Sequence, residues 1–451
     1  MSDQNPFFRR FSTSRKPPSP WRRWLGAGLG LLALAILVYN IPFVHDRLAW
    51  RLNDLRNSVV HFFNPPQEAL FAPSGVVGPT LEPTLRPTRT ATPAGAIATP
   101  TPTFEPLPAS AQLENVNFVT QQGRWNYCGP STLAMALNYW GWNGDRDDIG
   151  EVIKPGENNP GMDFVQRGEK DKNVMPYEME YFVDDYTELR ALTRVGGDVE
   201  LVKRMVANGF PVVIEKGYYE ADYRGIVDWL GHYLFVTGYD DARQAFVVQD
   251  TWDKNHPGEN VDSPYAEFIE GWRSFNFLFI VVYPAEREVE VLNLLGPWAD
   301  DEWANRRALE IAEGERASLT GLDQYYAWFN TGSSHVALFD YVDAANAYDY
   351  AFQLYNALDD ETYNRPYRMM WYQTGPYWAY YYSFRYQAVI DVANTTLSTW
   401  PDSEESLYWR GLARAGLGET DNAIADFQRS VYLNPNFGPG LAMLQQLGAT
   451  P

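Results

Sequence analysis

The chain contains a single cysteine, Cys128, and the residues around it are of a kind that activates a thiol. Gly129 and Pro130 follow it directly, and an apolar run at helical spacing then continues to Gly141. We therefore expect Cys128 to lie at the N-terminus of a helix. Free backbone N–H groups and the helix dipole at that end favour the thiolate over the thiol, which makes Cys128 a candidate nucleophile.

A histidine and an aspartate occur in two apolar segments, residues 231–240 and 244–250, that we expect to pair as a β-hairpin. Residues that oppose each other in an antiparallel ladder have numbers with a constant sum. A turn centred near Asp241 would therefore place His232 opposite Asp250 at the open end of the hairpin. The apolar pairs 236/246 and 234/248 would lie on the same face.

A thiol, an imidazole and a carboxylate in contact form the thiolate–imidazolium arrangement that is used for acyl transfer. The imidazole takes the thiol proton and later gives it to the leaving group, while the carboxylate holds the tautomer. Gln122, six residues before Cys128, could help the backbone N–H of Cys128 to stabilise an oxyanion. Gln121 is adjacent, and spacing alone barely separates the two glutamines.

Each of these residues also has a structural explanation when it is taken alone. A lone cysteine is usually a small buried hydrophobe, His232 could be a strand-end histidine, and Asp250 could form a turn. Because a nucleophile, a base and an orienting acid occur together, we favour catalysis. Asp250, Asp253 and His256 match no strong metal-ligand motif, so we expect neither a metal nor a cofactor.

The elements around these motifs predict an α+β domain. Residues 198–209 have the pattern of a short helix, with Asp198 as its N-cap and Gly209 at its end. The apolar segment 211–217 follows directly and has the composition of a strand. Helices and sheet strands therefore share one domain.

Three motifs together resemble the papain-fold cysteine peptidases related to the bacteriocin-leader (double-glycine) processing enzymes. They are Gln122-x5-Cys128-Gly-Pro-Ser, Gly231-His232-Tyr-x-x-Val-x-Gly-Tyr-Asp and Gln249-Asp250. The resemblance covers residues 113–285 and implies a peptide or protein substrate. It implies Cys128 as nucleophile, His232 as base and Asp250 as orienting acid. It also implies Gln122 in the oxyanion hole. We do not carry over the double-glycine substrate, because no transporter follows and we expect this domain to face outward.

The N-terminal part predicts a membrane anchor. Residues 1–23 are basic, and the uncharged stretch 24–44 is long enough for the roughly 30 Å hydrocarbon layer. The basic flank should stay in the cytoplasm and the remainder should lie outside it. A cleaved signal peptide is the alternative. Residues 45–112 would form a juxtamembrane segment and a Pro/Thr-rich linker, either a spacer with useful reach or a tether of no selected length.

Residues 292–451 predict an all-α region. Three windows that begin near Tyr325, Met370 and Glu404, at a period of about 34 residues, resemble tetratricopeptide repeats. The first window has Phe339 where a helix-ending glycine is usual. We expect this region to bind a protein partner or substrate. The aromatic-rich residues 369–386 could line a peptide groove or fill the space between helices, and we favour packing.

The composition is that of a chain with packed domains, because 45% of its 451 residues are hydrophobic. A formal net charge of −21 argues against nucleic-acid binding. We therefore predict a multidomain protein: a transmembrane helix, an α+β papain-like peptidase domain and tetratricopeptide-type repeats outside the cytoplasm. The alternative is a catalytically inactive papain-like domain that acts with the repeats as a binding scaffold.

Overall fold

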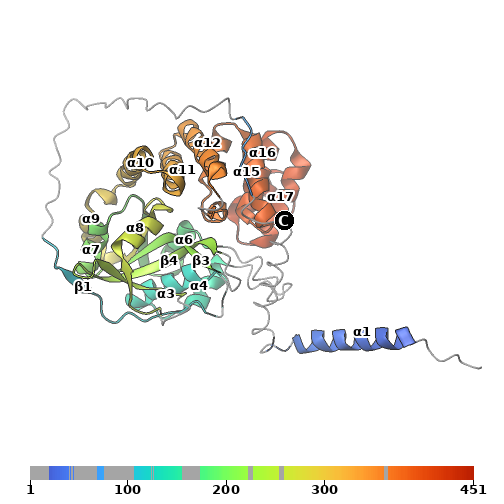
Figure 1. Cartoon of the computed structure of the whole chain (residues 1–451), viewed down its shortest axis with the longest axis horizontal. Coiled ribbons are helices and arrows are strands. Elements are labelled where there is room, and N and C mark those ends of the chain that lie inside the picture. Colours follow the sequence, from blue (N-terminus) through green and yellow to red (C-terminus); the bar gives the residue numbers. More distant parts are fainter. Residues whose placement is uncertain are drawn as a thin grey trace, which may run out of the picture. The chain divides into compact units, whose positions relative to one another are not determined.

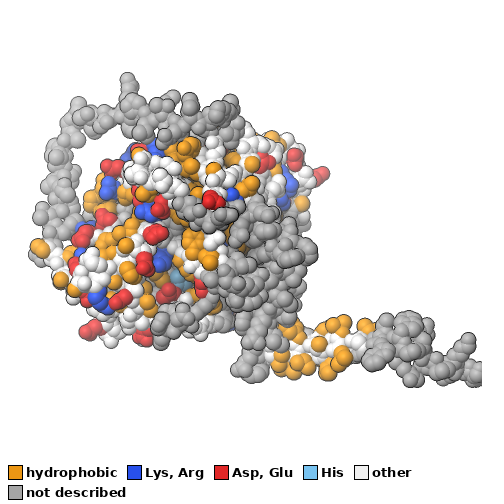
Figure 2. Space-filling model, viewed as in Figure 1, with side chains coloured by type: hydrophobic (Ala, Val, Ile, Leu, Met, Phe, Trp, Pro, Cys, Tyr) orange, Lys and Arg blue, Asp and Glu red, His pale blue; other side chains and the backbone are white. Residues whose placement is uncertain are grey.

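The structure is a computed structural model. It describes residues 20–39, 41, 44, 69–75, 106–122, 124, 126–154, 173–221, 227–252, 258–359 and 364–451. The chain divides into two units, residues 1–56 and 57–451. The first unit contains helix α1 (Pro20–Tyr39). Apolar side chains such as Leu31 and Leu37 are more than half exposed on it, and Figure 2 shows apolar side chains along this helix.

Among the residues that the structure describes, no helix has both the length and the apolar character needed to cross a membrane. The predicted span, residues 24–44, continues past the end of α1 at Tyr39 into residues that are described only in part. The membrane anchor therefore stays a prediction. Within the predicted linker, residues 45–112, the structure describes residues 69–75 and 106–112.

The part of the fold that contains Cys128 is built around one antiparallel sheet of seven described strands (Figure 1). Its order is β2-β7-β3-β4-β5-β6, and β1 pairs with the end of β4. The strands are β1 (Ser110–Gln112), β2 (Leu189–Arg194), β3 (Val212–Ala221), β4 (Val227–Asp240), β5 (Ala245–Gln249), β6 (Val261–Pro264) and β7 (Phe279–Pro284). β1 belongs to the stretch that composition assigns to the linker, so the sheet begins earlier than residue 113.

Helices cover both faces of this sheet (Figure 1). They are α3 (Cys128–Tyr139), α4 (Arg146–Ile153), α6 (Pro176–Tyr186), α7 (Val199–Ala207), α8 (Tyr265–Arg273) and α9 (Glu288–Leu295). Successive residues of a strand point to opposite faces. Val213 packs in the core with α3, α4 and α6, whereas Val212 and Ile214 pack in the core with α7, α8 and α9. The central strands are apolar on both faces for this reason.

The predicted helix over residues 198–209 and the predicted strand over residues 211–217 are confirmed. The Asp198 carboxylate accepts a hydrogen bond of 2.7 Å from the backbone N–H of Leu201 and caps α7. The chain reverses at Gly209, which has a φ of 85°, and then enters β3. A positive φ is the backbone conformation that a glycine after a helix supplies. The observed combination of sheet and helices agrees with the predicted α+β class.

The C-terminal part of the second unit is helical. Its helices are α10 (Asp301–Ser318), α11 (Gly321–Ala337), α12 (Tyr341–Ala357), α13 (Met369–Tyr372), α14 (Gly375–Tyr382), α15 (Tyr386–Thr399), α16 (Glu404–Gly416), α17 (Thr420–Leu433) and α18 (Gly438–Gln446). Most of the aromatic-rich run 369–386 packs between helices: Tyr377 and Tyr380 are fully buried. The assignment of these helices to tetratricopeptide repeats stays a prediction.

Three turns between paired helices share one backbone feature. Phe339 lies between α11 and α12, Phe384 between α14 and α15, and Gly418 between α16 and α17. Their φ angles are 62°, 61° and 82°. The two phenylalanines are 77% and 79% exposed, so burial of the ring does not offset the strain of a conformation that favours glycine.

Buried contacts join the sheet to the helical region within the second unit. The side-chain amide of Asn276 donates a hydrogen bond of 3.0 Å to the hydroxyl of Ser334 in α11. The ring of Tyr372, in α13, meets those of Trp229 and Phe275 edge-on at 5.7 and 5.8 Å. The helical region is therefore packed directly against β4, the strand that contains Trp229.

Candidate active site

Helix α3 begins at Cys128, so the thiol lies at a helix N-terminus as predicted. One turn later, the Thr132 hydroxyl donates a hydrogen bond of 3.4 Å to the carbonyl of Tyr233 and ties α3 to β4. Burial by itself raises the pKa of the Cys128 thiol. The hydrogen bond and charge of His232, the backbone N–H of Tyr233 and the charge of Lys154 outweigh burial and lower this pKa below 9.0. The environment thus favours the thiolate.

His232 lies on β4, and Asp250 directly follows β5. His232 Nε2 is 2.8 Å from Asp250 Oδ1, which also accepts a hydrogen bond of 2.9 Å from the backbone N–H of Trp252. Burial alone lowers the pKa of His232, but the neighbouring Asp250 and Cys128 raise it to about 10. For Asp250, burial alone raises the pKa. His232, the Trp252 N–H and Lys216 outweigh burial and bring the pKa of Asp250 below its usual value. Imidazolium and carboxylate are both stabilised in this pair.

The pairing of β4 with β5 differs from the predicted register. Asp240 opposes Ala245 and Val236 opposes Val248, with an irregularity between residues 236 and 238. The predicted pairs 236/246, 234/248 and 232/250 are therefore wrong, because the turn is centred between Ala242 and Arg243 instead of at Asp241, and the irregularity in β4 changes the count again. In the observed register Asp250 falls one step beyond Gln249, diagonal to His232 on the same face, and diagonal neighbours are within reach of long side chains.

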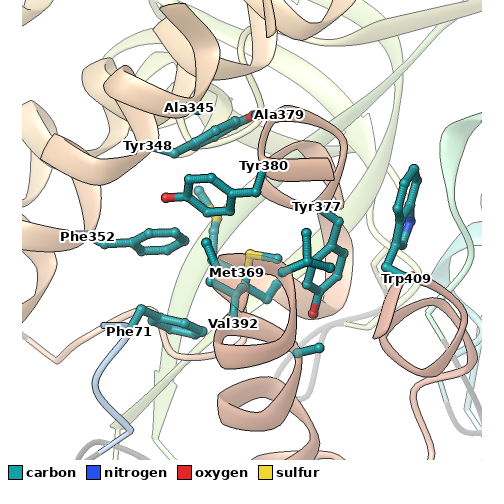
Figure 3. Close-up of a cluster of buried hydrophobic side chains, with 14 of the residues drawn as sticks. Phe71, Ala345, Tyr348, Phe352, Met369, Tyr377, Ala379, Tyr380, Val392 and Trp409 are labelled. Atoms are coloured by element: carbon teal, nitrogen blue, oxygen red, sulfur yellow. The ribbon is translucent and has the colours of Figure 1, made fainter. Parts of the chain in front are cut away.

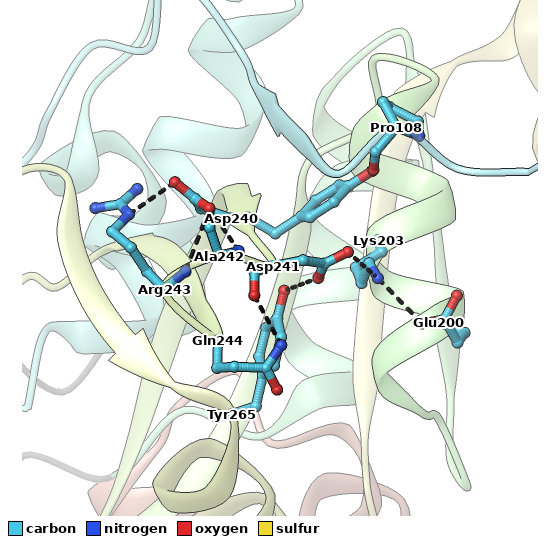
Figure 4. A network of polar contacts seen from close by, with 10 residues as sticks. Pro108, Glu200, Lys203, Asp240, Asp241, Ala242, Arg243, Gln244 and Tyr265 are labelled. Atoms are coloured by element: carbon cyan, nitrogen blue, oxygen red, sulfur yellow. Dashed lines mark hydrogen bonds and ion pairs between the residues drawn. The ribbon is translucent and has the colours of Figure 1, made fainter.

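Polar contacts hold the β4–β5 turn in this register (Figure 4). The Asp241 carboxylate accepts hydrogen bonds of 2.9 Å from Lys203 Nζ, in α7, and from the Tyr265 hydroxyl, in α8. Asp240 Oδ1 accepts a hydrogen bond of 2.9 Å from the backbone N–H of Ala242 inside the turn. Two helices on one face of the sheet therefore fix the hairpin that brings the histidine and the aspartate together.

The two candidate glutamines differ in their surroundings. Gln121 is buried: its backbone N–H donates to the Thr251 carbonyl at 3.0 Å, and its side-chain oxygen accepts from the Thr251 hydroxyl at 3.3 Å. Gln122 is exposed, and within the described residues its side-chain amide makes no hydrogen bond. Gln121 thus anchors the segment before Cys128 to the residue after Asp250, and the Gln122 amide is free to bind another group.

Glu215, on β3, is a buried acid that the sequence analysis missed. It is 2% exposed and opposes Tyr233. Burial and the nearby Cys128 raise the pKa of Glu215 well above 4.5. The Tyr233 hydroxyl acts against this shift and lowers the pKa of Glu215. The same hydroxyl donates a hydrogen bond of 2.9 Å to the Val174 carbonyl. A carboxylate inside the apolar run of β3 is the sequence signal that could have revealed Glu215.

Close packing beside His232 requires the glycine that precedes it. A Cβ at Gly231 would lie 2.7 Å from a ring carbon of Phe275 and 2.8 Å from the ring of Tyr372. Burial raises the pKa of Tyr372, and the charge of Cys128 acts in the same direction. The helical region thus reaches the surroundings of the catalytic candidates, which no local sequence pattern indicates.

Residues 108–279 match the family model described as the Peptidase_C39 like family. We refer to this stretch, which is similar to that family, as the C39-like domain. It contains Cys128, His232, Asp250, both glutamines and Glu215. Tyr372 lies outside it and belongs to the helical region. The resemblance to cysteine peptidases is therefore supported at the level of the family, and the narrower kinship with bacteriocin-processing enzymes stays a prediction.

Two solved structures resemble the C39-like domain at low similarity. A Bacillus anthracis protein described as a C39-like peptidase is 19% identical over 38% of this chain and 96% of its own, with a TM-score of 0.29. Xylellain, a cysteine protease from Xylella fastidiosa, is 17% identical over 40% of this chain and 87% of its own, with a TM-score of 0.27. No curated protein matches the chain. The similarity of this stretch to known proteins therefore rests on the family match.

Proposed function

We propose that the chain is a cysteine peptidase that cleaves peptide bonds through Cys128. The observation that carries this proposal is the line of contacts from Cys128 to His232 and from His232 to Asp250 within a C39-like domain. Each contact favours the charged form that nucleophilic catalysis requires. If these residues only filled an apolar core, burial would keep them neutral. The lowered pKa of the thiol and the raised pKa of the imidazole instead favour their charged forms.

The geometry supports a two-step reaction. His232 Nε2 contacts Asp250, so Nδ1 is the ring atom left for the Cys128 sulfur. The thiolate attacks the scissile carbonyl carbon and forms a C–S bond. The imidazolium gives its proton to the amide nitrogen as the C–N bond breaks, and the amine leaves. Water then attacks the thioester, His232 accepts a proton from this water, and the carboxylic acid product leaves as the thiolate returns.

The oxyanion of both tetrahedral intermediates needs hydrogen-bond donors. The backbone N–H of Cys128 lies at the beginning of α3, where helix N–H groups have no partner within the helix. We propose the exposed side-chain amide of Gln122 as the second donor. The buried amide of Gln121 has a structural role, since it is bonded to Thr251.

A thiol-directed activity probe tests the proposal. The wild-type protein should be labelled, Cys128→Ala should not be, and His232→Ala should react far more slowly while circular dichroism shows an unchanged fold. An unreactive Cys128 in folded wild-type protein would contradict the proposal and leave the binding scaffold as the better description. Comparing the peptides released from a proteome by wild-type and Cys128→Ala protein would then define the scissile bond.

We propose that the protein is anchored in the cell membrane with its C39-like domain and helical region outside the cytoplasm. The basic residues before residue 24, the uncharged stretch 24–44 and the exposed apolar side chains of α1 support this. Protease added to intact cells should then remove the C39-like domain. Its survival, with digestion only after lysis, would contradict this orientation.

We further propose that the helical region binds a protein partner or the substrate, as arrays of helix pairs commonly do. Its exposed aromatic residues, Phe339 and Phe384, support this. Cross-linking from these two positions, with the exposed Tyr432 as the control position, should capture a partner that the control does not. Equal capture from all three positions would contradict a specific surface.

A further inference from the structure

A short segment from the predicted linker lies against the helical region. In residues 69–75, Phe71 and Pro73 are buried, whereas Leu70, Ala72 and Ser74 are exposed. Burial of every second residue is the pattern of an extended strand-like peptide that lies along a surface. Phe71 is 2% exposed and Leu70 is 49% exposed, so the segment has one anchoring face and one open face.

The Phe71 side chain fills an aromatic pocket between helices (Figure 3). It stacks on Phe352 at 4.9 Å between ring centroids, with an angle of 24° between the rings. It also meets Tyr355 edge-on at 5.4 Å. Both partners lie in α12, and Met369 and Val392 belong to the same buried cluster. Burial of a phenylalanine side chain is worth about 1.5–3 kcal/mol, so this ring is the main apolar anchor of the segment.

Polar side chains of the helical region bind the backbone of the same segment. Asn356 uses both ends of its amide: Oδ1 accepts from the Phe71 N–H at 3.2 Å, and Nδ2 donates to the Phe71 carbonyl at 2.7 Å. Asp391 Oδ2 accepts from the Ser74 N–H at 2.9 Å, and Arg385 donates to the Ser74 carbonyl at 3.4 Å. These contacts recognise an extended backbone, while the pocket selects an aromatic side chain.

Arg385 is itself fixed in place. Its guanidinium forms two hydrogen bonds with the carboxylate of the buried Asp349, at 2.8 and 2.9 Å. The binding groups therefore come from α12, from the residue before α15 and from α15 itself. Packing of the Phe71 ring alone does not account for the Asn356 amide and two charged side chains that all bind the backbone of the segment.

We propose that the helical region contains a peptide-binding site for an extended segment with an aromatic anchor, and that residues 70–74 of this chain are its occupant. The segment after it is attached again at the sheet, where the Tyr239 hydroxyl donates to the Pro108 carbonyl at 2.8 Å and Ser110 pairs with Asp240. The Pro/Thr-rich residues between Gly75 and Pro108 thus connect two points of the same unit.

This docking site is independent of the proposed peptidase activity. It can be tested on the full chain by amide hydrogen exchange with mass-spectrometric readout. The N–H groups of Phe71 and Ser74 should exchange at least about tenfold more slowly than in a synthetic peptide of residues 68–76, because each is hydrogen-bonded to a side chain. Exchange at the rate of the free peptide would overturn the proposal.

Substitutions assign the protection to this site. Asn356→Ala and Phe71→Ala should each restore most of the free-peptide rate, whereas Leu70→Ala, at an exposed position of the same segment, should not. Asp391→Ala removes a partly exposed hydrogen-bond acceptor. It should therefore accelerate hydrogen exchange at the Ser74 N–H without unfolding α15. Protection that survives Asn356→Ala, Phe71→Ala and Asp391→Ala alike would overturn the site. Protection that falls on dilution would show that the occupant comes from a second copy and would overturn the intramolecular assignment.

Discussion

His232 and Asp250 are joined by a hydrogen bond of 2.8 Å although they lie diagonally across the β4–β5 pair and do not oppose each other. The Trp252 N–H donates a hydrogen bond of 2.9 Å to the same carboxylate oxygen. The carboxylate is thus fixed on two sides, so the histidine ring has one preferred orientation.

Asp250→Asn should lower kcat/KM by about 10²–10⁴, because an amide does not stabilise the imidazolium and can select the wrong tautomer. Steady-state assays on a peptide substrate measure this loss. Asp262→Asn, which breaks a surface ion pair with Arg243, is the matched control and should leave kcat/KM within about twofold. Equal losses in both variants would argue against a catalytic role for Asp250.

The pH dependence of thiol alkylation should reveal the ion pair. The pKa of Cys128 is lowered from 9.0 and that of His232 is raised to about 10, so thiolate and imidazolium coexist between the two values. Alkylation of wild-type protein by iodoacetamide should therefore begin below pH 9. Peptidase activity should fall in acid as the thiolate gains a proton, and fall again as pH rises through about 10 and His232 loses its proton.

His232→Ala supplies the control for this profile. Without the imidazolium, the alkylation rate of Cys128 should rise only toward pH 9 or above, because burial then dominates. Identical alkylation profiles for the variant and the wild type would show that His232 does not lower the thiol pKa.

Glu215→Gln should keep the fold and change how stability depends on pH. The folded-state pKa of Glu215 lies above its unfolded value, so its contribution to stability is present below the unfolded pKa and is lost as pH rises toward the folded pKa. In that interval wild-type stability should fall by up to about 1.4 kcal/mol per pH unit from this group. The stability of the Glu215→Gln variant should lack this dependence on pH.

Urea unfolding at pH 5 and pH 8 measures the effect of Glu215→Gln, and Glu188→Gln at an exposed position is the control. The stability of Glu215→Gln relative to wild type should increase between the two pH values, and that of Glu188→Gln should not. A difference that stays constant with pH would mean that Glu215 is charged in the folded protein.

The two glutamines should respond differently to truncation. Gln122→Ala should lower kcat by about 10²–10³ with little change in KM, as removal of an oxyanion donor does. Gln121→Ala should instead lower the free energy of unfolding by about 1–3 kcal/mol, since it leaves the buried Thr251 hydroxyl without its acceptor. The reverse pattern would transfer the oxyanion role to Gln121.

Gly231→Ala should destabilise the protein by about 1–3 kcal/mol and lower activity, because its Cβ would be forced against Phe275 and Tyr372 beside His232. Gly314→Ala in α10 is the matched control: its Cβ meets no atom within 4 Å, and alanine is favoured over glycine in a helix. Denaturant unfolding and kcat measure both effects. If the two variants were equally stable, the packing of the helical region against β4 would be looser than described.

Local features of this protein were predictable because neighbouring residues determine them. The helix that begins at Cys128 and the capping of α7 by Asp198 depend on side chains within one or two turns. The apolar face that carries His232 and Asp250 follows from the two-residue period of a strand. The candidate triad could therefore be assembled from sequence, even though the register that joined its histidine and aspartate was wrong.

Tertiary structure decided what depends on residues far apart in the chain. The bulge in β4 and the contacts of Asp241 with α7 and α8 set the register, and no short sequence pattern encodes them. The raised pKa of Glu215 depends on burial beside Cys128, and the docking of Phe71 depends on α12, which lies more than 250 residues away along the chain. Pairings and pKa values of this kind arise only when packing excludes water and brings distant side chains into contact.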